Sequence, residues 1–273
     1  MARQSGFGHS NPAFDRNPAF SRQGVGFAMP NATAADLQGM YDAPSAGPLQ
    51  TRRMTLDDVV VKCSAVFGTL FVAAGLTYFV LPAGTAMGLA LPAIVVGLVL
   101  GLVISFRQST NPAVILSYAV AQGLFLGAIS RAYESFYDGI VAQAVLGTLA
   151  AAGAMLFVFS TGRLRATPKF TKVLLTAGLA YLGIAVLNLL LSAFGVLDGY
   201  GIYSAGPLGL LLCAAGVGLA AFFLILDFDF VQRGIANGVP ARYSWFAAAG
   251  LLMTLVWLYV EVLRMLAILR GSD

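Results

Sequence analysis

The sequence predicts an all-α integral membrane protein with seven membrane-spanning helices. Of its 273 residues, 59% are hydrophobic and only 10% are charged, whereas about 25% of the residues in soluble domains carry a charge. The mean hydropathy is +0.83. Seven uncharged stretches are each long enough to cross a hydrocarbon core about 30 Å thick as a helix of roughly 20 residues. The ten-residue alternation typical of membrane β-barrels does not occur, which leaves helices as the spanning structure.

The uncharged stretches define the expected helices in chain order. Each has 18 to 25 residues, and they cover residues 63–82, 86–106, 113–130, 140–162, 173–197, 205–226 and 243–260. Prolines in or beside them are expected at helix ends or kinks: Pro82, Pro92, Pro112 and Pro207. Gly97 with Gly101, and Gly123 with Gly127, have GxxxG spacing. Small residues at this spacing let helices approach closely, and we expect that packing within one chain rather than between two.

Positive residues are concentrated in alternate connections. They are Arg52, Arg53 and Lys62 before or at the start of the first span, Arg107 after the second, Arg163, Arg165, Lys169 and Lys172 after the fourth, and Arg233 and Arg242 after the sixth. The opposite connections hold Arg131, which is outnumbered by Glu134, Asp138 and Asp198. Because Lys and Arg favour cytoplasmic loops, we expect a multi-pass protein of the plasma (inner) membrane with a cytoplasmic N-terminus and an external C-terminus.

Residues 1–53 are expected to form a disordered cytoplasmic tail, and residues 54–273 the seven-helix membrane domain. The tail contains the repeat NPAFDRNPAFSRQ and is rich in Gly, Ser, Ala and Pro, a composition that buries too little apolar surface to fold. It has no apolar core of a secretory signal, so the first span is expected to direct insertion. Phe14 and Phe20 suggest a docking motif for a cytosolic partner. A solvated leader with an incidental duplication is the simpler interpretation.

Two aspartates end the apolar run of the sixth span, in LILDFDFVQ at residues 224–232. A carboxylate held inside a helix bundle usually serves ion or proton chemistry. Asp227 and Asp229 point about 200° apart on a helix, so one can face the bundle while the other faces headgroups or a neighbouring helix. We expect at least one to pair with Arg107 or Arg233 near the cytoplasmic mouth. The alternative is a solvated helix end offset by Arg233.

The last span carries an acid nearer the outer boundary. Thr254, Leu258 and Glu261 share one face by the i, i+4, i+7 spacing. If that face is interior, Thr254 is the polar group closest in depth to the aspartates. Glu261 is expected to contact Arg264 at i+3, or an outer group around Arg131 and Glu134, rather than Asp227.

Several chemistries lack the residues they need. The only histidine is His9 in the tail, so a Ser-His protease and a zinc HExxH site are excluded, and the last span has neither the aspartate of an aspartyl protease nor the lysine of a retinal protein. Cys63 and Cys213 lie inside spans and are expected to be packing residues. We therefore expect no enzyme, cofactor, stable metal site or nucleic-acid partner. The bilayer is the expected partner, and the oligomeric state stays open.

Four motifs together resemble the Bax inhibitor-1/YccA family of membrane proteins. They are SFRQS at 105–109, QGLFLG at 122–127, LILDFDFVQRG in the sixth span and LVWLYVEVLRMLAIL at 255–269. The resemblance covers about residues 55–270, and NPAF with LDFDF is similar to an actinobacterial-type branch. It implies a bundle whose last helix is central. It also implies a pH-sensitive calcium leak, gated by two aspartates on the last two helices, with an arginine after the second span as a latch.

Carried onto this chain, the resemblance makes Arg107 the latch and Asp227 or Asp229 the first aspartate. The second aspartate falls at Thr254, which cannot titrate, so a pair of carboxylates that shares a proton is in doubt. Either Asp227 and Asp229 divide the gating role, or Glu261 supplies a second acidic site. We favour the first for gating and the second for attracting cations. Calcium suits oxygen ligands and is expected only as a transient guest.

The predicted function is a pH-sensitive cation (calcium) leak channel gated by acidic residues near the cytoplasmic mouth. The alternative is a non-conducting membrane regulator that binds other membrane proteins, such as a quality-control protease, through the Phe-containing tail or the basic loop at 163–172. A proton-coupled transporter is less favoured, because the halves show no repeat with broken helices.

Overall fold

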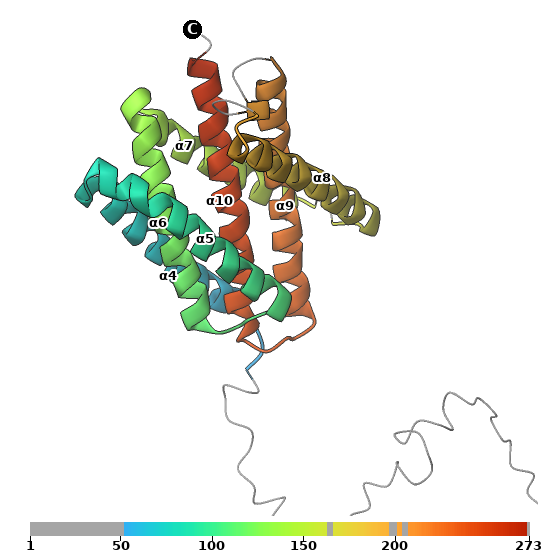
Figure 1. Ribbon diagram of the computed structural model, residues 1–273. Coiled ribbons are helices and arrows are strands. Elements are labelled where there is room, and N and C mark those ends of the chain that lie inside the picture. Colours follow the sequence, from blue (N-terminus) through green and yellow to red (C-terminus); the bar gives the residue numbers. More distant parts are fainter. Residues whose placement is uncertain (1–51, 163–165, 197–200, 204–206, 272–273) are drawn as a thin grey trace, which may run out of the picture. The chain divides into compact units, whose positions relative to one another are not determined.

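Seven long helices form the domain in the computed structural model, which describes residues 52–162, 166–196, 201–203 and 207–271. They are α4 (Leu56–Gly75), α5 (Ala83–Arg107), α6 (Pro112–Phe136), α7 (Ile140–Ser160), α8 (Pro168–Ala193), α9 (Pro207–Ala236) and α10 (Tyr243–Arg270). A π-helical turn, η1 (Leu76–Val80), continues α4, and a short 3-10 turn, η2 (Gly201–Tyr203), precedes α9. All seven helices are long and apolar enough to cross a membrane, which confirms the predicted fold class (Figure 1).

Several helices extend beyond the uncharged stretches that predicted them, whereas α7 lies within its stretch at 140–162. The first begins at Leu56, because Thr55 caps it together with Asp58. The sixth continues to Ala236 and the seventh to Arg270. Charged side chains near helix ends can reach water without interrupting the backbone, so charge marks the edge of an apolar run better than the end of a helix. Asp227 therefore lies nine residues, about 13 Å, before the end of α9 rather than one turn from it.

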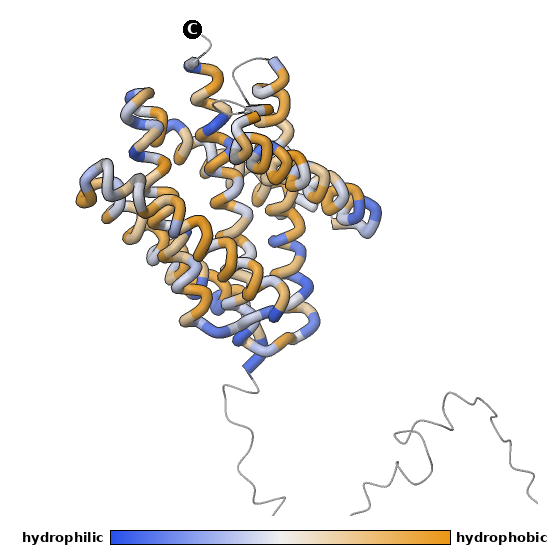
Figure 2. The backbone as a smooth tube through the Cα atoms, in the orientation of Figure 1, coloured by the Kyte–Doolittle hydropathy of each residue, from blue (hydrophilic) through white to orange (hydrophobic). Residues whose placement is uncertain are grey.

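The last helix occupies the middle of the bundle, as the resemblance implies. It packs against α4, α5, α6, α7 and α9, and the Tyr181 ring of α8 lies 5.9 Å from the Trp257 ring of α10. Leu252, Leu258 and Leu263 of α10 are fully buried. Figure 1 shows α10 running between the other helices, and Figure 2 shows hydrophobic residues along the helices with hydrophilic ones gathered mainly toward the two ends.

The start of α4 lies beside the loop that joins α9 to α10. Arg53 forms an isolated antiparallel bridge with Pro240, so these segments share one end of the bundle, here called the loop end. The C-terminus of α10 lies at the opposite end, here called the C-terminal end (Figure 1). Arg52 and Arg53 belong to the predicted tail, and both are described. The rest of the tail, with His9, Phe14 and Phe20, lies outside the described residues, as do Arg163, Arg165 and Asp198.

The predicted glycine packing occurs within the chain. Gly123 and Gly127 of α6 lie directly against α4: a methyl group at Gly123 would be 2.6 Å from the Leu70 carbonyl oxygen, and one at Gly127 would be 2.5 Å from the Ala74 carbonyl oxygen. The other pair faces α6 and α10, with Gly97 against Gln122 and Gly101 near Tyr118 and Met253. Close backbone approach replaces the hydrophobic drive that lipid does not supply.

Replacing Gly127 with Ala should destabilise the bundle, because the new methyl group would meet backbone atoms of α4 that cannot rotate away. Overpacking of this kind costs about 1–3 kcal/mol. The matched control is Gly153→Ala in α7, where no atom lies within 4 Å of the added methyl group. Thermal unfolding in detergent should show a lower midpoint for Gly127→Ala alone. Equal midpoints for the two variants would contradict the tight α4–α6 contact.

Candidate ion-gating site

Asp227 of α9 faces the central helix. The Thr254 hydroxyl on α10 lies beside its carboxyl group, and a methyl group at Gly250 would lie 3.6 Å from its Oδ1 atom. Gly250 and Thr254 are one turn apart, so the missing side chain at Gly250 leaves room for the carboxylate beside the hydroxyl. Asp227 Oδ2 is buried and has no hydrogen-bond partner among the described residues.

Asp229 points elsewhere, as the two-residue spacing requires. Its side chain is 19% exposed and forms an ion pair with Arg233 one turn later on α9. Of the two arginines considered from the sequence, Arg233 is therefore the partner in this conformation. The two aspartates are therefore not equivalent. The charge of Asp229 is balanced by Arg233 on the same helix, whereas none of the ion pairs among the described residues includes Asp227.

Glu261 lies in the same seam between α9 and α10, farther from the loop end. It is buried, at 3% exposure, and its carboxylate pairs with Arg264 at 3.2 Å and accepts a hydrogen bond from Trp257 Nε1 at 3.3 Å. The predicted i+3 pair is thus confirmed. Gly216 of α9 lies opposite, where a methyl group would be 2.9 Å from Glu261 Cδ. Thr254 and Glu261 are separated by seven residues, about 10 Å along the helix.

Apolar residues close the seam between these two levels. Ala220 and Leu224 of α9 and Leu258 of α10 are fully buried in one hydrophobic cluster. Thr254, Leu258 and Glu261 are all buried, so the face predicted from their spacing is interior. The seam therefore holds an acid beside a hydroxyl, then an apolar seal, then a second acid with its own cation. Leu224 and Leu258 are inaccessible to solvent in this conformation.

Other predicted site residues lie apart from this seam. Arg107, the last residue of α5, is exposed, and none of the ion pairs in the described part of the chain includes it. Arg131 donates to the Tyr78 and Leu81 carbonyl groups, which lie at the end of the π-helical turn. Glu134 accepts from the Gly139 and Val141 amides, at 2.7 and 3.0 Å. These two residues thus hydrogen-bond to backbone groups at helix ends and do not contact Glu261.

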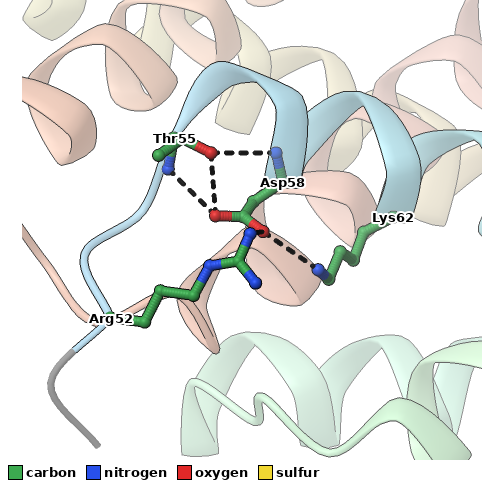
Figure 3. Close-up of polar contacts among 4 residues, drawn as sticks. All are labelled: Arg52, Thr55, Asp58 and Lys62. Carbon is green, nitrogen blue, oxygen red and sulfur yellow. Dashed lines mark hydrogen bonds and ion pairs between the residues drawn. The ribbon is translucent and has the colours of Figure 1, made fainter. Parts of the chain in front are cut away.

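A buried carboxylate at the loop end was missed from the sequence. Asp58, 4% exposed, accepts from the Thr55 hydroxyl at 2.8 Å and forms ion pairs with Arg52 at 3.0 Å and Lys62 at 3.4 Å. Figure 3 shows these side chains converging on the carboxylate from the first turns of α4 and the segment before it. We call this group the Asp58 clamp. Two sequence features could have predicted this group: the T-x-x-D capping pattern and the lysine at i+4.

Backbone hydrogen bonds join the segment before α4, next to the Asp58 clamp, to the loop between α9 and α10. The Met54 amide donates to the Val239 carbonyl, and the Ala241 amide donates to the Arg52 carbonyl, both at 2.8 Å. The Met54 side chain is buried with Val231 and Ala247, and Val231 lies one turn beyond Asp227 on α9. The segment before α4 therefore supports the part of α9 that holds the aspartates.

The acidic groups do not converge on one point. Within the described ranges, no three His, Cys, Asp or Glu side chains lie together as a metal ion would require. Asp58, Asp227, Asp229 and Glu261 each have different neighbours and lie at different levels.

One family comparison covers almost the whole chain. The model of the family described as Bax inhibitor 1 like matches residues 11–271. The match includes all seven helices, and it begins in the tail rather than near residue 55, where the motifs alone placed the start of the resemblance. A comparison with curated proteins gives no match.

Replacing Asp58 with Asn should loosen the loop end, because the buried carboxylate would lose its ion pairs with Arg52 and Lys62. A lost charged hydrogen bond of this kind costs about 1–3 kcal/mol. Hydrogen exchange should then accelerate at the Met54 and Ala241 amides. Asp57→Asn is the matched control, since Asp57 has the same charge and is exposed in the same turn. The clamp would have no structural role if both variants exchanged at the same rate.

Proposed function

The chain belongs to the Bax inhibitor 1 like family, and on this premise we propose that it is a pH-sensitive cation leak channel, with calcium as its ion and Asp227 as its gating group. The proposal rests on one observation: a carboxylate held inside the bundle beside Thr254, with a buried oxygen that lacks a hydrogen-bond partner among the described residues. Such an arrangement is costly in a membrane-spanning helix. Selection for stability alone would favour an apolar residue there.

We propose that the loop end faces the cytoplasm of a plasma-membrane protein. The described positive residues before and in the first turns of α4, at the end of α5 and around the α9–α10 loop belong to this end: Arg52, Arg53, Lys62, Arg107, Arg233 and Arg242. Lys169 and Lys172 lie in the first turns of α8, where Phe170 packs against Phe222 near the middle of α9. The positive-inside rule supports this orientation. Asp227 would then lie between the cytoplasmic mouth and the apolar seal.

The proposed gate uses the contact between Asp227 and Thr254. An ionised carboxylate accepts the Thr254 hydrogen bond and ties α9 to α10. A proton or a cation at the carboxylate competes for the same oxygen lone pairs and weakens that tie. Movement of α9 would then separate Leu224 from Leu258 and admit ions toward Glu261, where an entering cation would compete with Arg264 for the carboxylate.

Threonine at position 254 makes this gate different from a carboxylate pair. Two close carboxylates titrate as a coupled pair, whereas Asp227 faces a hydroxyl that does not titrate. We therefore propose that one proton controls the seam, while Asp229 with Arg233 sets the charge at the mouth. The latch role implied for Arg107 would belong to another conformation, in which Arg107 replaces Arg233 beside an aspartate.

Calcium flux into liposomes with purified protein tests the gate. Flux should rise as the pH falls, with the steepness of a single protonation, because loss of the Asp227 charge weakens the tie to α10. Asp227→Asn, which is neutral at every pH, should give flux that no longer depends on pH. Glu261→Gln should reduce the flux at every pH without changing the shape of the pH profile.

Two controls make this result specific to Asp227. Asp57→Asn removes an exposed charge from the same end and should leave the pH profile unchanged. Asp229→Asn should alter the total flux but keep its pH dependence. Retention of the wild-type profile by Asp227→Asn would rule out this gate. Absence of flux at any pH from folded protein would contradict the channel itself and favour the non-conducting regulator that binds a membrane protein partner.

A further inference from the structure

An apolar groove opens on the side of the bundle, away from the proposed gate. It has a volume of about 700 Å³, and its walls come from α4 with η1 and from α7, while α6 and α10 form its floor. Representative wall residues are Phe71 and Val145, and the floor includes Leu126 and Val256. The groove lies toward the C-terminal end, since it reaches the last turns of α4 and the first turns of α7.

The medium in front of this groove is hydrocarbon if the helices span a bilayer. The side chains on its two rims are apolar and exposed, with Phe71 at 61% and Leu149 at 60% exposure. Both belong to helices long and apolar enough to cross a membrane. An aqueous ligand would have to pass through lipid to enter from this side, whereas an acyl chain can enter laterally.

Polar groups occur at one end of the groove. Ser130 and Tyr259 form a buried hydroxyl pair at 2.7 Å, and Tyr78 and Glu134 also line the space. Glu134 is the only charged residue among the described lining residues. Its two oxygens each accept one backbone amide, which leaves acceptor capacity because a carboxylate has about four lone-pair sites.

The nearby arginines are already engaged by the backbone, and one of them, Arg270, donates to the Asp138 carbonyl at 2.7 Å. Arg131 donates to the Tyr78 and Leu81 carbonyls and is not among the groove residues. The charge that the groove presents is therefore negative. This favours an ammonium group over an anionic one at the polar end, with the apolar walls left for a chain.

We propose that this groove binds one acyl chain of a phospholipid whose headgroup carries an ammonium group, with the ammonium directed to Glu134. The chain would lie between α4 and α7 and contact α10 at Val256 and Tyr259. The ligand class is thus an ethanolamine-type phospholipid rather than an anionic glycerol-type one. The bilayer itself supplies the ligand.

Photo-cross-linking in nanodiscs tests this site. Phospholipid probes with a diazirine on the acyl chain, and either an ethanolamine or a glycerol headgroup, are irradiated with the intact protein, and the labelled peptides are identified by mass spectrometry. The ethanolamine probe should label the α4 and α7 groove peptides more than the exposed faces of α5 and α8. Even labelling of all exposed helices would overturn the proposal, because it would indicate annular lipid alone.

Val145→Trp tests the binding of the acyl chain, because the indole ring would project from α7 and fill part of the groove. It should reduce labelling of the groove about tenfold, the loss expected when about two methylene groups are displaced from apolar contact. Leu146→Trp is the matched control, because Leu146 is the next residue of α7, is 67% exposed and lies outside the groove lining. Equal labelling of the two variants, both with wild-type thermal midpoints, would overturn the site.

The headgroup is tested in wild-type protein and in Glu134→Gln. The wild-type groove should label with the ethanolamine probe in preference to the glycerol probe, and Glu134→Gln should reduce that preference about threefold, as expected for one partly exposed ion pair. Asp138→Asn, which removes a nearby exposed acid outside the lining, should leave it unchanged. Preferential labelling by the anionic probe in wild-type protein would overturn the headgroup assignment.

Discussion

The structure depends on one constraint: α10 is enclosed by other helices, so a buried polar group on it can find partners only in protein and not in water or headgroups. Three of its hydroxyl and carboxylate side chains meet this constraint in different ways, whereas the buried Ser244 hydroxyl has no partner among the described residues. Tyr259 and Ser130 of α6 share a hydrogen bond, Glu261 contacts Arg264 and Trp257 on its own helix, and Thr254 lies beside Asp227 of α9. Of these three contacts, only the last leaves an oxygen without a partner in the described part of the chain.

This difference separates two acids that look alike in the sequence. Glu261 and Asp227 both interrupt apolar helices, and both lie in the α9–α10 seam. Glu261 pairs with the Arg264 guanidinium one turn away and accepts a hydrogen bond from the Trp257 indole, so its charge is balanced on its own helix. Asp227 has a hydroxyl and an open glycine position beside it, so its charge state bears directly on how α9 meets α10. We propose Asp227 rather than Glu261 as the gating group for this physical reason.

Helix α4 links the two ends of the molecule. The Asp58 clamp and Met54 hold its start against α9 and α10 at the loop end, and Gly123 with Gly127 draw its second half onto α6. Because α4 is held that closely to α6, the space between α4 and α7 stays open toward the C-terminal end. One helix therefore supports the region around the aspartates and also forms a wall of the lateral groove.

The sequence alone determined the number of helices and put Arg264 within reach of Glu261 on the same helix, because apolar length and local spacing set both. It favoured glycine packing within one chain and gave the face of Thr254, Leu258 and Glu261 only as a candidate interior face, and the structure decided both. It misjudged the helix ends, since charged residues such as Asp58 and Arg270 remain helical when they are capped or can reach water. Only the tertiary structure decided that Asp227 meets Thr254, that Asp229 takes Arg233 while Arg107 stays exposed, and that Asp58 is buried. Those outcomes depend on which faces of distant helices meet, and no spacing within a single helix specifies that.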